Sequence, residues 1–180
     1  AVYVDRFGEG IERIYHSAKN LRGKTRGAVG TQASFMLFYR DPEKLEELVM
    51  ERLGIEPARI TTQILHPESE ADLLLRILLT FGTLNDLAND MRHLQRQEIG
   101  EVYEAFGPGQ VGSSTMPHKR NPVSFENVCG QYREMLGESV SVLANIESEH
   151  QRDMRNSAPQ RYHVPEIIGA FVYSVRNMNR

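Results

Sequence analysis

The sequence predicts an all-α protein built as a bundle of long helices. Apolar residues recur at three- and four-residue spacing over several long stretches, which is the period of an amphipathic helix. We find no convincing strand, no internal repeat and no low-complexity segment. At 180 residues and 40% hydrophobic content, the chain is long enough for one substantial core. Long helices packed around such a core form a bundle.

Two helices are expected in the N-terminal third. The first precedes the glycine-containing stretch 23–30, because apolar residues from Phe7 onward follow the pattern i, i+4, i+7, i+8. The second lies between Asp41, a good N-cap that is followed by proline, and Gly54, a good C-cap. The stretch between these helices is predicted to be a loop.

Three more helices are expected in the rest of the chain. The longest covers about 67–97, and its leucines spread over more than one face, so we expect other helices, some from neighbouring subunits, to surround it. Another helix runs from Pro122 to about Glu147, and the last starts at Pro165. Residues 149–157 between them are too charged for a core and poorly patterned for a helix.

Composition excludes several classes of function. The net charge of −3 gives no global reason to expect a nucleic-acid partner. The longest strongly apolar run, 73–79, is interrupted by Arg76 and is far too short to cross a bilayer. The single cysteine, Cys129, excludes an internal disulfide and is expected to be an ordinary buried residue. We therefore expect a cytoplasmic protein without metal ion, cofactor, nucleic-acid partner or membrane contact.

The stretch 112–122, Gly-Ser-Ser-Thr-Met-Pro-His-Lys-Arg-Asn-Pro, is predicted to be a solvent-facing loop because it has almost no large apolar side chain. Its backbone N–H groups, its hydroxyls and the cations Lys119 and Arg120 suit an anionic substrate. Cations and amides that stabilise an alkoxide could make Ser113 or Ser114 a proton acceptor or a nucleophile. A short basic surface turn is the alternative.

This complete string, followed by Glu126 and Asn127, resembles the signature loop of the fumarase/aspartase superfamily of lyases. The resemblance implies a mostly helical homotetramer with shared active sites, which eliminates fumarate from a succinyl-type substrate. It implies that Ser113 is the general base. The substrate contacts that it implies in and after the loop are Ser114, Lys119, Asn121 and Asn127.

A second patch, Thr61-Thr62-Gln63, precedes the longest predicted helix. It resembles the Ser/Thr-Thr-Gln segment of the adenylosuccinate lyase branch, which implies that Gln63 holds a carboxylate or a base edge. A helix cap and turn cluster is the alternative. The nearby stretch 26–31 resembles a glycine-containing segment of the same enzymes, and we expect a structural role for it.

A third patch, 150–153, resembles the His-Glu-Arg-Asp stretch of the same branch. The resemblance implies that Arg152, Ser157 and Arg161 bind substrate, and two guanidinium groups with a hydroxyl suit a phosphate or a carboxylate. Sister enzymes that share the serine loop, the argininosuccinate lyases and carboxymuconate cycloisomerases, are not expected to carry this pattern. The alternative is a solvated network of ion pairs with the neighbouring acids Glu147, Glu149 and Asp153.

Two features depart from the family pattern. Gln151 replaces a common glutamate, and Glu68, Glu70 and Asp72 place negative charge near a site that should hold an anion.

The resemblance covers residues 1–180 as a central helical-bundle domain that looks truncated at both ends. It places the general acid, a histidine, in a segment upstream of this sequence, so the chain alone is expected to be inactive. The predicted reaction is the cleavage of adenylosuccinate, and of the related succinyl carboxamide nucleotide, in purine biosynthesis. The alternatives are a sister lyase or cycloisomerase of the superfamily and a non-catalytic helical protein of the same fold.

Overall fold

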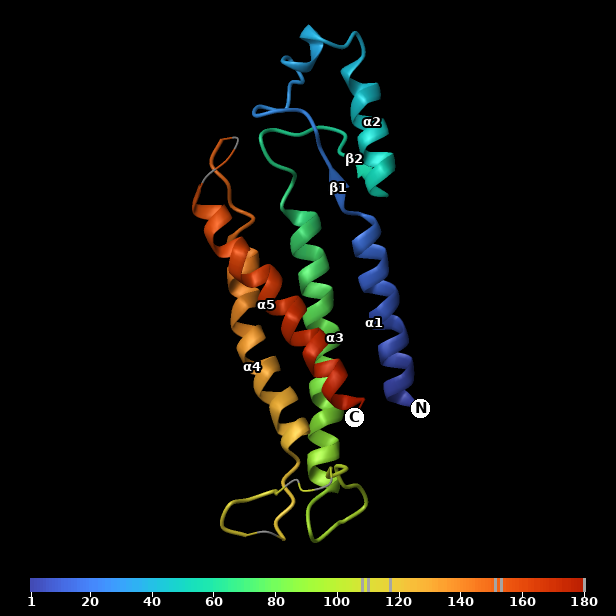
Figure 1. The fold of residues 1–180 in the computed structure, drawn as a ribbon, viewed down its shortest axis with the longest axis vertical. Coiled ribbons are helices and arrows are strands. Elements are labelled where there is room, and N and C mark those ends of the chain that lie inside the picture. Colours follow the sequence, from blue (N-terminus) through green and yellow to red (C-terminus); the bar gives the residue numbers. More distant parts are fainter. Residues whose placement is uncertain (108, 110, 117, 151, 153, 180) are drawn as a thin grey trace.

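The computed structural model describes residues 1–107, 109, 111–116, 118–150, 152 and 154–179. In these residues the chain forms five α-helices (Figure 1). Their bounds are α1 Val2–Lys19, α2 Pro42–Leu53, α3 Glu68–Leu94, α4 Val123–Ala144 and α5 Met154–Met178. The remaining elements are a single 3₁₀ turn, η1 Phe35–Leu37, and two very short strands. The predicted all-α bundle of long helices is confirmed.

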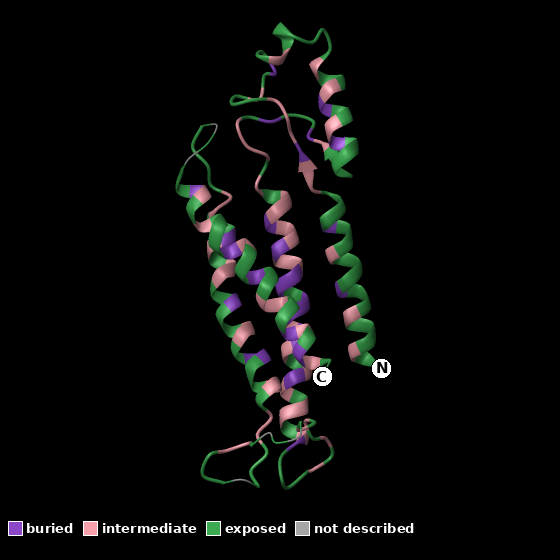
Figure 2. Ribbon diagram, in the orientation of Figure 1, coloured by how far each residue is buried: buried purple, intermediate pink, exposed green. Residues whose placement is uncertain are grey.

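Helix α3 is the centre of the bundle. It packs against α1, α4 and α5, and α4 also packs against α5. Its buried side chains meet those of α4 and α5 around Phe81, whose ring lies edge-on to Tyr132 and Phe171 at centroid distances of 5.5 and 5.6 Å. Figure 2 shows the buried residues concentrated along α3. This agrees with the prediction from its leucines, which spread over more than one face of the helix.

Helix α2 begins and ends where its sequence predicts. The Asp41 carboxylate accepts the backbone N–H of Lys44 at 3.1 Å, which satisfies one of the free donors at the helix start. At the other end Gly54 adopts a left-handed conformation, with φ of 70°.

Helix α5 begins at Met154, 11 residues earlier than expected, so the prediction that it starts at Pro165 was wrong. Its first turns are stabilised by tertiary contacts rather than by an apolar pattern. The Asn156 amide donates to the carbonyl groups of Asn145 and Glu147 at 2.9 and 2.7 Å, and His163 is fully buried. These contacts outweigh the cost of Pro159 and Pro165 inside the helix.

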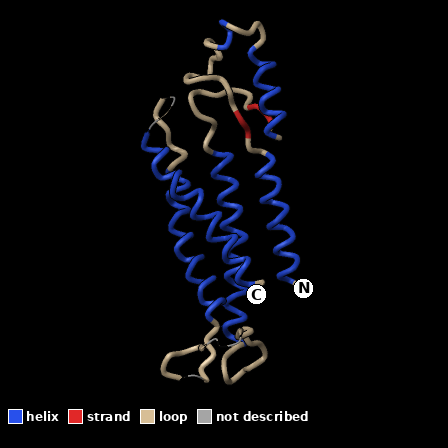
Figure 3. Tube along the Cα trace, in the orientation of Figure 1, coloured by secondary structure: helices blue, strands red, loops and turns tan. Residues whose placement is uncertain are grey.

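Two strands that the sequence did not predict, β1 Arg22–Gly23 and β2 Glu56–Pro57, pair in parallel (Figure 3). At two residues each they are too short to produce an alternating pattern. A Cβ atom at Gly23 would lie 2.2 Å from the Met50 sulfur, so a larger residue there would force the Met50 side chain to move. The strands thereby attach α2 to the top of the bundle in Figure 1.

Several apolar residues on the helix surfaces remain exposed in the single chain. Ile11 and Tyr15 form such a stripe on α1, and Leu136, Val140 and Leu143 form one on α4. Within the described residues, none of the helices combines the length and the apolar character that a membrane crossing requires.

Candidate active-site residues at two ends of the bundle

The signature loop closes one end of the bundle, between α3 and α4 (Figure 1). Gln95, buried just after α3, holds this loop from inside. Its side-chain oxygen accepts the Glu104 N–H at 3.2 Å, and its amide donates to the Arg120 carbonyl at 3.3 Å. The Glu104 carboxylate in turn accepts the N–H of Phe125 in the first turn of α4, at 2.9 Å. The loop is therefore attached to both helices.

The Ser113 hydroxyl oxygen faces two backbone donors. It accepts the N–H groups of Thr115 and Met116 at 3.3 and 3.2 Å. The turn continues with an N–H of Lys119 that donates to the Met116 carbonyl at 2.9 Å. Hydrogen bonds to an oxygen favour its anionic form, so this geometry suits a serine that accepts a proton.

Gly112 brings the two ends of the loop together. A side chain there would lie 2.0 Å from the Lys119 carbonyl oxygen, so the position requires glycine. The Asn121 amide donates to the Gly112 carbonyl at 3.5 Å. The loop therefore gathers Ser113, Ser114, Lys119 and Asn121, while Asn127 lies exposed one turn into α4.

A cavity of about 660 Å³ lies beside this loop. Lys119 and Asn121 line it from the loop. Arg92, in the last turn of α3, and Arg96, just after that helix, line it as well. The cavity thus carries an excess of positive charge, as an anionic ligand requires. The two arginines were not predicted as site residues, although two arginines four residues apart around a helix end, near a basic loop, were a usable signal.

The other predicted site residues lie at the opposite end of the bundle. Helix α4 has 22 residues, and at ~1.5 Å per residue it separates Asn121 from the segment before α5 by ~33 Å. Within one chain, Ser113 is therefore not brought together with Arg152, Ser157 and Arg161.

The earlier start of α5 brings Ser157 and Arg161 onto one helix face, four residues apart. The Ser157 hydroxyl donates to the Met154 carbonyl at 3.4 Å, and the Arg152 and Arg161 side chains are exposed. In the described residues, Glu147 pairs with Arg155 at 3.7 Å, and no carboxylate lies within 4.0 Å of either exposed arginine. Gln151 and Asp153 fall outside the described residues.

Gln63 lies at this same end, because α3 starts beside the start of α5.

Two of the acids near Gln63 have hydrogen-bond donors. The Gln160 amide donates to the Glu70 carboxylate at 2.9 and 2.7 Å. Asp72 accepts hydrogen bonds from Ser17 and Arg76. Two of the acids that departed from the family pattern therefore have donors of their own.

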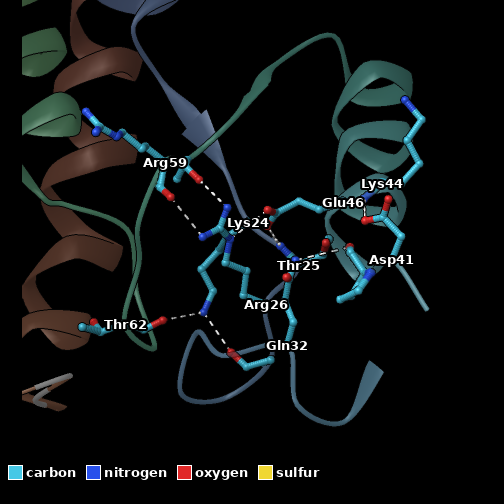
Figure 4. A network of polar contacts seen from close by, with 12 residues as sticks. Lys24, Thr25, Arg26, Gln32, Asp41, Lys44, Glu46, Arg59 and Thr62 are labelled. Carbon is cyan, nitrogen blue, oxygen red and sulfur yellow. Dashed lines mark hydrogen bonds and ion pairs between the residues drawn. The ribbon is translucent and has the colours of Figure 1, made fainter. Parts of the chain in front are cut away.

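The backbone around Gln63 is held by the stretch that follows β1 (Figure 4). The Lys24 ammonium group donates to the carbonyls of Gly27, Thr62 and Gln63 at 3.0, 3.1 and 2.5 Å. A side chain at Gly30, where φ is +75°, would lie 2.3 Å from the Thr61 carbonyl oxygen. This close packing confirms the structural role expected of residues 26–31.

Comparison with known proteins adds three findings. A protein-family model described as Lyase matches residues 1–137. The adenylosuccinate lyase of Pyrococcus horikoshii is 46% identical over 167 residues, and that of Aquifex aeolicus is 36% identical over 173. These matches cover 92% and 96% of this chain but only 36% and 38% of the relatives. The crystal structure of 3-carboxy-cis,cis-muconate lactonizing enzyme from Pseudomonas putida matches with a TM-score of 0.79 and 26% identity, over 94% of this chain and 37% of that one.

Proposed function

The chain belongs to the lyase family, and from this premise we propose that it is the helical core of an enzyme that eliminates fumarate from a succinyl-amino substrate. The proposed substrate is adenylosuccinate, which gives AMP and fumarate, together with the equivalent succinyl carboxamide nucleotide of purine biosynthesis. The observation that carries the proposal is the closed serine loop, with its backbone donors on Ser113, in a chain similar to adenylosuccinate lyases.

In the proposed reaction Ser113 acts as the base. Its oxygen, as alkoxide, takes the proton from the carbon next to a carboxylate of the succinyl group, and the electron pair moves into that carboxylate. The pair then forms the C=C bond of fumarate while the C–N bond breaks. The leaving nitrogen keeps the electrons of that bond and takes a proton from an acid, which the family resemblance places on a histidine outside this sequence.

The charge that develops on the substrate carboxylate needs fixed donors. The Lys119 ammonium group, with the Ser114 hydroxyl and the Asn121 amide in the same loop, supplies them. Asn127 adds a contact from the first turns of α4. The cationic cavity beside the loop favours entry of a dicarboxylate.

Arg152, Ser157 and Arg161 hold the phosphate of the nucleotide in this proposal, and Gln63 holds a carboxylate or a base edge. Two guanidinium groups and a hydroxyl offer enough donors for a phosphate. Fixing the remote end of the substrate aligns the C–N bond with the base, and such positioning contributes several kcal/mol to catalysis.

The two groups of residues lie at opposite ends of α4, so one active site must combine residues from different copies of the chain. We therefore propose a homotetramer with shared sites, acting in the cytoplasm. The exposed apolar stripes on α1 and α4 support this assembly, because large apolar patches on a helix surface are typical of interfaces.

The proposal is tested with the full-length polypeptide that carries this chain. The purified protein is incubated with adenylosuccinate, and fumarate is measured. We expect Ser113→Ala to lower kcat by about 10²- to 10⁴-fold, the usual contribution of a general base. Ser139→Ala, which changes a half-buried serine on α4 far from the loop, is the matched control and should retain full activity.

Other outcomes point to the alternatives. Turnover of argininosuccinate or of a carboxymuconate in place of adenylosuccinate would assign the protein to a sister enzyme of the superfamily. No turnover of any of these substrates would favour a non-catalytic helical protein.

A further inference from the structure

We propose that Lys24 is a positioning residue for Gln63, acting through the main chain of residues 62–63 and not by touching the substrate. This inference rests on the proposed function, in which Gln63 contacts the substrate. The contacts that carry it lie in the lobe formed by β1, β2 and α2 (Figure 4).

The first observation is the complete coordination of the Lys24 ammonium group. A lysine side chain has three N–H donors. The three acceptors are the carbonyl oxygens of Gly27, Thr62 and Gln63, at 3.0, 3.1 and 2.5 Å. Since every donor has a protein acceptor, the group is not available to an anionic ligand, and its role is to hold three carbonyls in one place.

The second observation is that Arg26 binds the beginning of the segment 58–63, whose end Lys24 binds. Its guanidinium group donates to the carbonyls of Ala58 and Arg59 at 2.8 and 3.1 Å. In an extended chain residues i and i+2 project to the same side. Arg26 therefore fixes the beginning of the segment 58–63, and Lys24 fixes its end.

The third observation is the rigid support behind these two cations. Glu46 of α2 is 1% exposed, and its carboxylate binds the Arg26 side chain at 2.8 Å and the Thr25 N–H at 2.9 Å. Moving the Glu46 carboxylate away from these partners would leave a buried charge unpaired, which is unfavourable. The network therefore holds the Lys24 backbone relative to α2.

Partial burial of the Lys24 ammonium group has a desolvation cost that an exposed lysine does not have. Burial lowers the pKa of its ammonium group, since desolvation disfavours the charged form, while the nearby Glu46 carboxylate opposes this effect. Such a cost is tolerated where the hydrogen bonds of the charged form are needed.

The test measures steady-state kinetics of full-length Lys24→Met, Gln63→Ala and the double variant with adenylosuccinate. Methionine keeps the length of the side chain and removes its donors. We expect Lys24→Met to raise KM about tenfold and to change kcat less than about threefold, because it removes binding shared by the substrate and the transition state. The double variant should be no worse than Gln63→Ala alone, since Lys24 acts only through Gln63.

Two further variants separate positioning from folding. Lys24→Arg keeps the charge and the donors and should recover part of the lost affinity. Lys44→Met changes an exposed lysine of the same lobe that pairs with Glu47, and it should behave as wild type. Hydrogen exchange of the amides in residues 61–65 should be faster in Lys24→Met, with exchange in the middle of α3 unchanged.

The outcomes are distinguishable. A wild-type protein without lyase activity overturns the proposed function, and the exchange measurement still decides whether Lys24 holds the segment. An active wild type with a Lys24→Met variant of unchanged KM overturns the inference. Additive losses in the double variant also overturn it, because they indicate that Lys24 contacts the substrate or acts through another residue.

Discussion

Phe81 is the residue on which the packing of the bundle converges. Its side chain is fully buried and touches the rings of Tyr132 on α4 and Phe171 on α5. Removing the ring leaves a cavity between three helices that cannot all move inward. We expect Phe81→Ala to lower the free energy of unfolding by about 3–5 kcal/mol in urea denaturation. Phe81→Leu keeps most of the volume and should cost clearly less. Equal losses in the two variants would contradict this packing.

Tyr3 provides a pH-dependent link between α1 and α3. Its hydroxyl donates to the Asp90 carboxylate, and this hydrogen bond, followed by burial and the charge of Asp86, raises its pKa from 10.0 to about 12. The raised pKa means that the folded state retains the proton more tightly than the unfolded state. The stabilising contribution is thus complete below pH 10 and is lost as the pH rises through 12.

An alkaline titration followed by tyrosinate absorbance tests this link. The difference between wild type and Tyr3→Phe should show a single transition near pH 12. In Asp90→Asn the transition should move toward the ordinary value, because the charged acceptor is gone. A Tyr3 transition near pH 10 in the wild type would show that the hydrogen bond does not form in solution.

At the scale of the elements, the start of α5 depends on one amide. Asn156 is buried and donates to the carbonyls of Asn145 and Glu147, just after α4 ends. These carbonyls have no helical partner of their own. We expect Asn156→Ala to lower the free energy of unfolding by about 1–3 kcal/mol, the cost of leaving buried polar groups unpaired. Circular dichroism in urea measures this loss, and Asn156→Asp, which cannot donate, should not restore stability.

The same region shows what the sequence could not predict. The helices α1 to α4 follow from apolar periodicity and from caps such as Asp41 and Gly54, which are local signals. The first turns of α5 contain prolines and charged residues, and contacts with α3 and α4 stabilise them, so no local pattern marks their start. The strands β1 and β2 likewise pair across more than thirty residues of sequence, so no local pattern marks them.

The residues proposed for the candidate site come from the sequence and stay a prediction, whereas their arrangement comes from the fold. The loop around Ser113 carries its chemistry in a continuous string, and a sequence shows such strings directly. The Lys24 and Arg26 contacts with residues 58–63 join segments more than thirty residues apart, so only the fold reveals them. The separation of the loop from the segment before α5 follows from the length of α4, which the sequence approximated well.

At the scale of the whole molecule, the exposed apolar stripe on α4 should form a contact between copies. Leu136, Val140 and Leu143 are 45%, 69% and 52% exposed in the single chain. Burying a charge in such a contact without a partner is unfavourable. We expect Val140→Glu to shift the full-length protein from tetramer toward smaller species in analytical ultracentrifugation. Glu134→Lys changes the charge on another face of α4 and should leave the tetramer intact. A monomeric wild type would contradict the proposed assembly.

The proposed sharing of active sites between copies leads to the strongest test of the molecule as a whole. Ser113 and Arg161 are separated by helices that span tens of ångströms, so the proposed site takes them from different copies. Ser113→Ala and Arg161→Ala should each be inactive alone. In randomly mixed tetramers, however, some sites receive both intact residues, and activity should return to about one quarter of the wild-type value.

The matched control for this experiment pairs two defects in one loop. Mixed tetramers of Ser113→Ala and Lys119→Ala contain no intact loop, since both residues belong to the same turn. These mixtures should stay inactive, whereas the mixture of Ser113→Ala and Arg161→Ala recovers. Each variant chain carries only one change. If only the mixture of Ser113→Ala and Arg161→Ala recovers, the two ends of the bundle must meet across a subunit boundary. If neither mixture recovers although hybrid tetramers form, each copy must assemble its site alone, which the ~33 Å length of α4 does not allow without a different packing of the helices.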